Sequence, residues 1–223
     1  AWPGARQRAD ALLIGRNLHG DRLPLFWCVN SREELDPLSD ALGPDQPVYG
    51  MRTLCRVPGR KPEHNPPLAR LYADELEQLQ PEGPIVIGGF CEGGKITLEM
   101  ARLLRERGRT VARLILQDEF VPRRYDGPVS LYMCRPGSQI WARDFPRPER
   151  AWPRFYPGPL HIEHLEATHR NCYESPAVED FARRLRRETD SVHQENSPAP
   201  VDATRELLDA GVHAAELSAR PPT

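Results

Sequence analysis

The stretch that decides the fold reads IVIGGFCEGGK and covers residues 85–95. It begins as an apolar run, typical of a buried strand, and a helical pattern follows directly after the glycines. Gly89 and Gly93 flank Cys91 at a spacing of two residues on each side. This pattern predicts a tight strand-to-helix turn that projects the Cys91 side chain from its tip, with the two glycines supplying the bare backbone that lets the turn close.

On both sides of this turn, short β-type runs alternate with helical patterns. The expected strands cover residues 12–14, 25–29, 47–51, 85–87, 111–116, 129–133 and 160–167, and the expected helices cover 31–41, 68–79, 96–104 and a segment from about residue 176. Runs that are apolar on both faces are typical of buried parallel strands. The sequence therefore predicts an α/β fold in which helices flank both faces of a mostly parallel sheet.

The helix expected over residues 31–41 begins with a capping-box pattern. Ser31 precedes Glu34 by three residues, so its hydroxyl can accept from the Glu34 amide while the Glu34 carboxylate reaches back to the Ser31 amide.

Two stretches depart from this alternation. Residues 135–159 are rich in proline and follow no clear period, which predicts a long excursion over the sheet edge, and its Trp141 and Trp152 either line an acyl pocket or cap the sheet. Beyond Thr189 the composition turns polar. We therefore expect one folded domain over residues 1–189, followed over 190–223 by a polar linker with a possible short terminal helix.

Composition excludes several classes of protein. Hydrophobic residues make up 39% of the chain and charged residues 28%, as in globular domains, and no apolar run approaches the roughly 20 residues of a bilayer span. The net charge of -2 gives no electrostatic reason to expect a nucleic-acid or membrane partner. The first residues do not resemble a secretory signal, so we expect a cytoplasmic protein.

The cysteines are odd in number and widely spaced. They are Cys28, Cys55, Cys91, Cys134 and Cys172, and no two of them form a Cys-x-x-Cys pair. This spacing gives no reason to expect a metal site or a redox pair, and it predicts free thiols in a reducing compartment.

Cys91 is the candidate nucleophile. The helix that starts beneath it favours negative charge at its N-terminus, which would help both a thiolate and the oxyanion formed after attack on a carbonyl. The alternative interpretation is a glycine-rich turn that contains an ordinary buried cysteine.

A nucleophilic cysteine needs a base, and His169 is the best placed of the seven histidines. It follows the last expected strand, and active residues of such sheets gather at the carboxyl ends of the strands. His161 and His164 fall within that strand and are interpreted as structural or surface groups.

Asp118 is the candidate acid that would orient the imidazole and stabilise its charged form. It ends the apolar strand over residues 111–117, and Glu119 and Asp144 are the competing carboxylates. The order Cys91, Asp118, His169 is the order nucleophile, acid, histidine of α/β hydrolases.

Taken together, residues 23–187 resemble the thioesterase domains of nonribosomal peptide and polyketide synthetases, which are α/β-hydrolase relatives. The resemblance rests on the segments PLFWCV (24–29), PVYGMR (47–52), PEGPIVIGGFCEGG (81–94), LQD (116–118) and DGPV (126–129). It implies release of an acyl or peptidyl chain from the phosphopantetheine of a carrier protein, with no cofactor bound directly. In that family the acid follows the strand corresponding to residues 111–117, which favours Asp118 over Asp144.

Three departures from the family pattern affect the expected site. Most members carry serine where Cys91 stands, and the sequence does not distinguish a natural cysteine from an engineered one. The family's glycine-rich turn after the first core strand is replaced by Asn30-Ser31-Arg32. We therefore expect the oxyanion to be held by the backbone N–H of Glu92 together with that of Asn30 or Ser31. Only residues 119–128 stand where the family inserts a helical lid, so the lid is expected to be reduced or absent.

The chemistry implied is transfer of the acyl group to Cys91 and then to water, or to an amine or hydroxyl of the chain itself. Because exchange of one thioester for another is close to thermoneutral, the cysteine favours cyclising or aminolytic release. Two alternatives stay open. One is a freestanding α/β hydrolase or editing thioesterase acting on small esters or thioesters, and the other is a non-catalytic module that binds a carrier protein.

Overall fold

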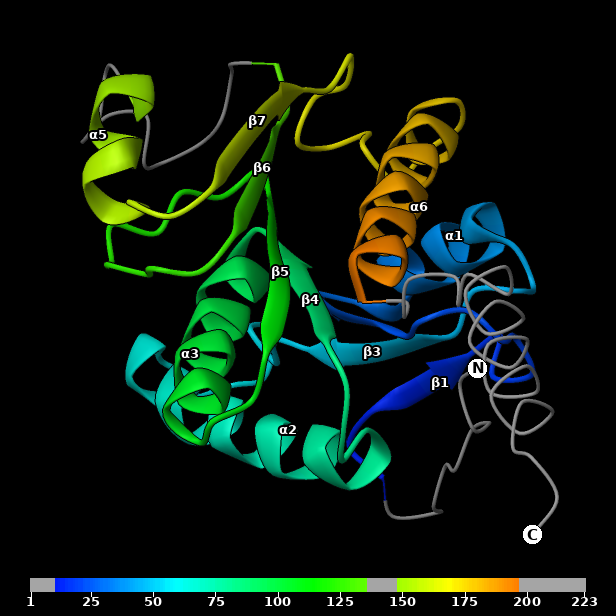
Figure 1. The fold of residues 1–223 in the computed structure, drawn as a ribbon. Coiled ribbons are helices and arrows are strands. Elements are labelled where there is room, and N and C mark those ends of the chain that lie inside the picture. The colour runs from blue at the N-terminus through cyan, green and yellow to red at the C-terminus, as the bar shows by residue number, and fades with distance from the viewer. Residues whose placement is uncertain (1–10, 136–147, 197–223) are drawn as a thin grey trace, which may run out of the picture.

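A seven-stranded sheet forms the centre of the structure, a computed structural model that describes residues 11–135 and 148–196 (Figure 1). The strand order is β1 (Ile14–Arg16), β3 (Val48–Arg52), β2 (Leu25–Val29), β4 (Ile85–Phe90), β5 (Val111–Gln117), β6 (Val129–Met133) and β7 (Leu160–His164). All neighbouring strands are parallel except β1, which is antiparallel to β3. The predicted mostly parallel sheet is confirmed.

The direction in which the chain adds strands to the sheet reverses after β3. β3 pairs with one edge of β2, and the next strand, β4, pairs with the other edge. Strands β2 and β4 are buried along their whole length, as their continuous apolar runs predict. In open α/β sheets such a reversal leaves a crevice at the carboxyl ends of the strands. The turn that carries Cys91 follows β4 at this edge of the sheet.

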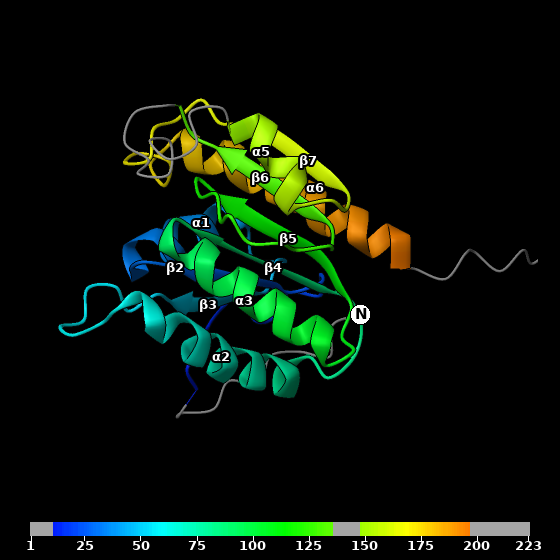
Figure 2. The same cartoon turned by 90° about the vertical axis from the view of Figure 1, so that its left-hand side faces the viewer.

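Helices cover both faces of the sheet (Figure 2). One face is covered by α2 (Asn65–Leu79) and α3 (Glu92–Glu106), and the other by α1 (Arg32–Leu42) and α6 (Ala177–Asn196). The buried apolar residues fall into two clusters, one beneath each helix pair. In the part of the chain that the structure describes, no helix combines the length and the apolar character needed to cross a membrane.

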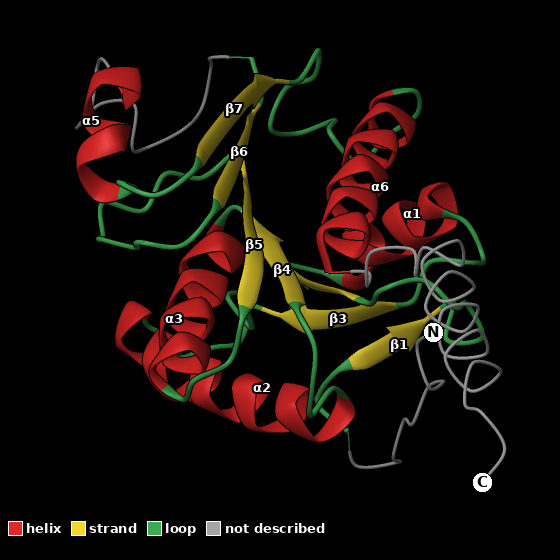
Figure 3. Cartoon of the chain, in the orientation of Figure 1, coloured by secondary structure: helices red, strands yellow, loops and turns green. Residues whose placement is uncertain are grey.

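The connection from β5 to β6 contains no helix, as the secondary-structure colours of Figure 3 show. This agrees with the expected loss of a lid at residues 119–128. Among the described residues of the proline-rich excursion, Pro148–Phe155 form the helix α5, which the prolines did not predict. Trp152 of α5 is buried, and its ring centroid lies 5.9 Å from that of Phe120. Trp152 therefore caps the core. Trp141 lies outside the described residues.

Helix α6 continues to Asn196, past the boundary expected at Thr189. Val192 on this last part of the helix is buried against the sheet, which explains why the polar composition did not end the helix there. The terminal helix expected over residues 202–217 lies outside the described residues.

Candidate active site

Cys91 occupies a strained corner between β4 and α3. Its backbone has φ 51° and ψ -124°, a conformation that L side chains rarely adopt. The Cys91 N–H donates to the carbonyl of Gln117 at 3.0 Å, and its own carbonyl accepts from Gly94 at 2.9 Å. Such strain persists only where the surroundings fix it, and here it places the half-buried thiol at the tip of the turn.

The glycines on either side of Cys91 are required by close backbone contacts. A Cβ on Gly93 would lie 2.3 Å from the carbonyl oxygen of Cys28 in the central strand β2. A Cβ on Gly89 would lie 2.6 Å from the carbonyl carbon of Gly93. The start of α3 therefore packs directly on β2 and β4, as the glycine spacing predicts.

Asp118 holds the imidazole of His169. The residue follows β5 with φ 50°, and its Oδ2 lies 2.5 Å from Nδ1 of His169. Its other oxygen, Oδ1, accepts from the backbone N–H of Cys134 at 3.1 Å, and the side chain has no exposed surface. The carboxylate is thus fixed on both sides and keeps Nδ1 of His169 as a hydrogen-bond donor.

His169 lies between this carboxylate and the thiol. The hydrogen bond that His169 donates to Asp118 is the largest cause that raises the pKa of His169 to about 10, and the interaction with Cys91 is the next. Its ring stacks on Phe90, with the centroids 4.7 Å apart, and 28% of its side chain is exposed. The structure thus brings Cys91, His169 and Asp118 together from three separate strand ends.

Tyr173 braces the loop that carries His169. Its hydroxyl accepts from Nε1 of Trp27 at 3.0 Å and donates to Oε1 of Gln117 at 2.8 Å. Its ring meets Phe90 edge-on at 5.1 Å. These contacts join the loop to β2, β4 and β5. Nothing in the sequence pattern singled out Tyr173.

The competing carboxylates are placed elsewhere. Glu119 lies 3.7 Å from Nζ of Lys95 and accepts from the N–H of Phe120 at 3.0 Å. Asp144 lies outside the described residues. Of the two candidates that the structure describes, only Asp118 contacts His169.

Burial of Glu119 makes stability depend on pH. Desolvation raises the pKa of Glu119 from 4.5 to about 7. The folded state therefore keeps this proton where the unfolded chain has released it, so the contribution to stability is full below pH 4.5 and is lost as the pH rises through 7. We expect Glu119 to lower the free energy of unfolding by roughly 3 kcal/mol across this range. Urea titrations at several pH values should show this slope flattened in Glu119→Gln and retained in Glu106→Gln, a change at an exposed position of α3.

The backbone N–H groups expected to hold the oxyanion differ in whether they already have an acceptor. Glu92 is the first residue of α3, so its N–H belongs to the helix end that has no internal acceptor. The Asn30 N–H instead donates to Oε2 of Glu34 at 2.8 Å, and that carboxylate also lies against the Ser31 N–H. The expectation that Asn30 or Ser31 offers a free amide is not met, because Glu34 reaches back over the start of α1.

Two arginines that follow β5, the histidines of the last strand and three of the cysteines lie apart from Cys91, His169 and Asp118 or in the core. Arg123 pairs with Glu99, and Arg124 with Asp126 at 2.9 Å. His161 pairs with Glu163 at 2.8 Å on β7, where His164 also lies. Buried cysteines occur at Cys28, Cys134 and Cys172.

The sheet order, the strained corner and the strand-end positions of its three side chains define an α/β-hydrolase fold. A family model described as "Thioesterase domain" matches residues 37–128. The dimodular nonribosomal peptide synthase of Bacillus subtilis (strain 168) is 32% identical over 124 residues, which are 52% of this chain and 5% of that protein. Over these residues the chain is similar to thioesterase domains, and it spans a small part of this curated relative.

Solved structures of thioesterase domains share the fold. The NocB thioesterase domain, in covalent complex with a fluorophosphonate nocardicin G analog, superposes with a TM-score of 0.64 at 19% identity, covering 80% of this chain and 99% of that one. The SrfTE domain, described as cyclising the lipopeptide antibiotic surfactin, gives 0.61 at 15% identity, covering 84% and 96%. At these identities the likeness concerns the fold.

Proposed function

We propose that this chain is a thioesterase domain that takes an acyl or peptidyl group from a carrier-bound thioester onto Cys91 and then releases it. The observation that carries the proposal is the Asp118–His169 hydrogen bond beside a thiol at a strained strand-to-helix corner. The relatives support it, since they are thioesterase domains. The partner proposed is the phosphopantetheine arm of an acyl or peptidyl carrier protein.

The first half-reaction transfers the acyl group. The Cys91 thiolate, formed as His169 takes its proton, attacks the thioester carbonyl and forms the new C–S bond. Negative charge on the carbonyl oxygen is stabilised by the Glu92 N–H at the helix N-terminus. Collapse breaks the bond to the carrier sulfur, which leaves with the proton from the His169 imidazolium. Asp118 stabilises that imidazolium throughout.

The second half-reaction frees the chain. His169 removes a proton from the acceptor, which attacks the acyl-Cys91 carbonyl, and the proton then returns to the Cys91 sulfur as it leaves. Water as acceptor gives hydrolysis, and an amine or hydroxyl of the chain gives a ring. An acyl-cysteine retains the activation of the incoming thioester, whereas an acyl-serine ester has lost part of it. We therefore propose cyclising or aminolytic release as the favoured outcome.

The covalent step can be tested by mass spectrometry of the intact protein after exposure to acyl and peptidyl thioesters. We expect a mass increase of one acyl group, mapped to Cys91 by peptide digestion. Cys91→Ala should abolish it, and His169→Gln should slow it by about 10²-fold or more. His161→Gln is the matched control, because that exposed histidine lies on β7 and pairs with Glu163.

Several outcomes would contradict the proposal. Acylation of Cys55 in place of Cys91, or equal rates with and without His169, would remove the assigned roles. Binding of the carrier protein without any acylation of the chain would indicate a non-catalytic module that binds the carrier protein. Equal rates from a carrier protein and from a small thioester would favour a freestanding hydrolase. Release of the free acid alone from every chain that has an internal nucleophile would exclude cyclisation.

A further inference from the structure

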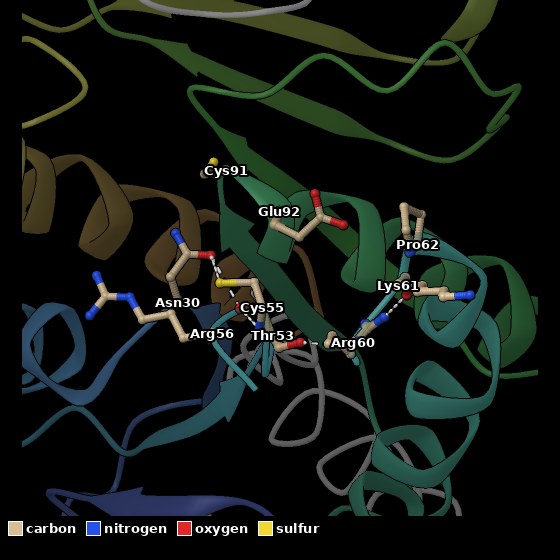
Figure 4. Close-up of a pocket in the computed structure, with 9 residues that line it drawn as sticks. All are labelled: Asn30, Thr53, Cys55, Arg56, Arg60, Lys61, Pro62, Cys91 and Glu92. Carbon is tan, nitrogen blue, oxygen red and sulfur yellow. Dashed lines mark hydrogen bonds between the residues drawn. The ribbon is translucent and has the colours of Figure 1, made fainter. Parts of the chain in front are cut away.

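A cavity of about 430 Å³ opens beside Cys91 (Figure 4). One wall is formed by Cys91 and Glu92 at the start of α3, and another by the segment that follows β3, residues 53–61. Asn30 at the end of β2 closes one side. Its size lies within the range of small-molecule sites. Cys91 is one of its lining residues, so an acyl group on Cys91 can extend into it.

The cavity is lined by more positive than negative charge. Its basic residues are Arg56, Arg60 and Lys61, and its one acidic lining residue is Glu92. The Glu92 carboxylate is already bound, since Oε1 accepts from Nδ2 of Asn65 at 2.9 Å and Oε2 from Nζ of Lys95 at 2.8 Å.

Arg60 is held in place by neutral groups. Its Nε donates to the Thr53 carbonyl at 3.3 Å, and its two Nη groups donate to the Lys61 carbonyl and to Oδ1 of Asn65. Within residues 11–135 and 148–196, no carboxylate forms an ion pair with Arg60, whereas the charge of Arg56 interacts with the carboxylates of Glu33 and Glu34. The Arg60 guanidinium is therefore positioned while its charge has no carboxylate partner.

Asn65 links the Arg60 guanidinium to the turn that carries Cys91. Its side chain accepts a hydrogen bond from Arg60 and donates one to Glu92, the residue after Cys91. In Figure 4, Arg56 extends past Asn30 at one end of the cavity, and Arg60 and Lys61 lie at the other. Positive charge beside a reaction centre favours a negative group, and arginine binds carboxylates with directed hydrogen bonds.

We propose that this cavity selects an acyl or peptidyl chain that carries a carboxylate a few bonds from its thioester carbonyl. The inference rests on the proposed function, since it concerns the chain transferred to Cys91. The phosphate of a carrier arm has the same charge, but it is separated from the thioester by the whole pantetheine. A cavity that Cys91 itself lines fits a group close to the thioester carbonyl, on the acyl side.

The test compares glutaryl-N-acetylcysteamine with its methyl ester, which has nearly the same shape and no charge. We expect kcat/KM for Cys91 acylation to be about 10- to 100-fold higher for the carboxylate, as one or two charged hydrogen bonds would give. The preference should fall in Arg60→Gln and, independently, in Arg56→Gln, whose exposed side chain makes folding failure a poor explanation. Arg124→Gln, an exposed arginine paired with Asp126, should keep it.

A second experiment distinguishes the acyl carboxylate from the phosphate of the carrier protein. The neutral acyl chain is presented on pantetheine and on phosphopantetheine. A rate increase from the phosphate alone, with none from the acyl carboxylate, would assign the cavity to the carrier arm and overturn the proposal. Equal rates for glutaryl and its methyl ester would also overturn it while leaving the thioesterase function intact. Failure of every thioester to acylate Cys91 would instead reject the proposed function.

Discussion

Asp118→Asn should lower kcat/KM for acyl transfer by about 10⁴-fold, as loss of the orienting carboxylate does in other triads. An amide presents a donor as well as an acceptor to Nδ1 of His169, so the ring is no longer held in one tautomer. The same change should bring the pKa of His169 down from about 10 toward its ordinary value of 6.5, because Asp118 is the largest cause of that shift. Imidazole NMR titration and thioester kinetics measure both effects.

The raised pKa of His169 also makes the stability of the fold depend on pH. A histidine whose pKa is raised by folding stabilises the folded state fully below pH 6.5, and the contribution is lost as the pH rises through about 10. Asp118→Asn should remove this slope, whereas Asp126→Asn, at an exposed position, should retain it. An unchanged His169 pKa in Asp118→Asn would contradict the arrangement of the site.

Gly93→Ala should destabilise the fold by about 3 kcal/mol or more, the upper range for overpacking. The added Cβ would lie 2.3 Å from the Cys28 carbonyl oxygen, and β2 is buried between two strands, so neither backbone can move away cheaply. Urea denaturation followed by circular dichroism measures the loss.

Gly94→Ala is the matched control, since it lies next in the same helix. Its Cβ would meet Cβ and Cγ of Glu119 at 3.2 Å and 3.3 Å, so Glu119 needs to shift by only a few tenths of an ångström, and alanine favours the helix. We expect a change within about 1 kcal/mol. If Gly93→Ala were tolerated as well as Gly94→Ala, the close contact of α3 on β2 would be wrong.

Much of the fold and of the candidate site could be predicted from local patterns. The apolar runs of β2, β4 and β5 are long enough to identify buried strands, and the residues that follow strands in an α/β sheet are brought to one edge. His169 and Asp118 could be found for this reason alone. The sequence favoured Asp118 and kept Glu119 as a competitor, because two adjacent carboxylates differ in which way each side chain turns, and the structure shows that Asp118 is the one that contacts His169.

The capping-box pattern at Ser31 and Glu34 shows where two predictions conflicted. If the Glu34 carboxylate reaches back to the start of its helix, the amides there are no longer free for an oxyanion, and the structure has the carboxylate on Asn30 and Ser31. Helix α5 was missed for a different reason. Its prolines argue against a helix, yet packing of Trp152 on Phe120 stabilises it.

The contacts of Tyr173 also limit the side from which a substrate can approach Cys91. A segment anchored to three neighbouring strands cannot swing aside to admit a bulky donor, so the imidazole side of the corner acts as a fixed wall. An acyl chain on Cys91 would then extend to the opposite side of the corner, where the segment after β3 lines the cavity.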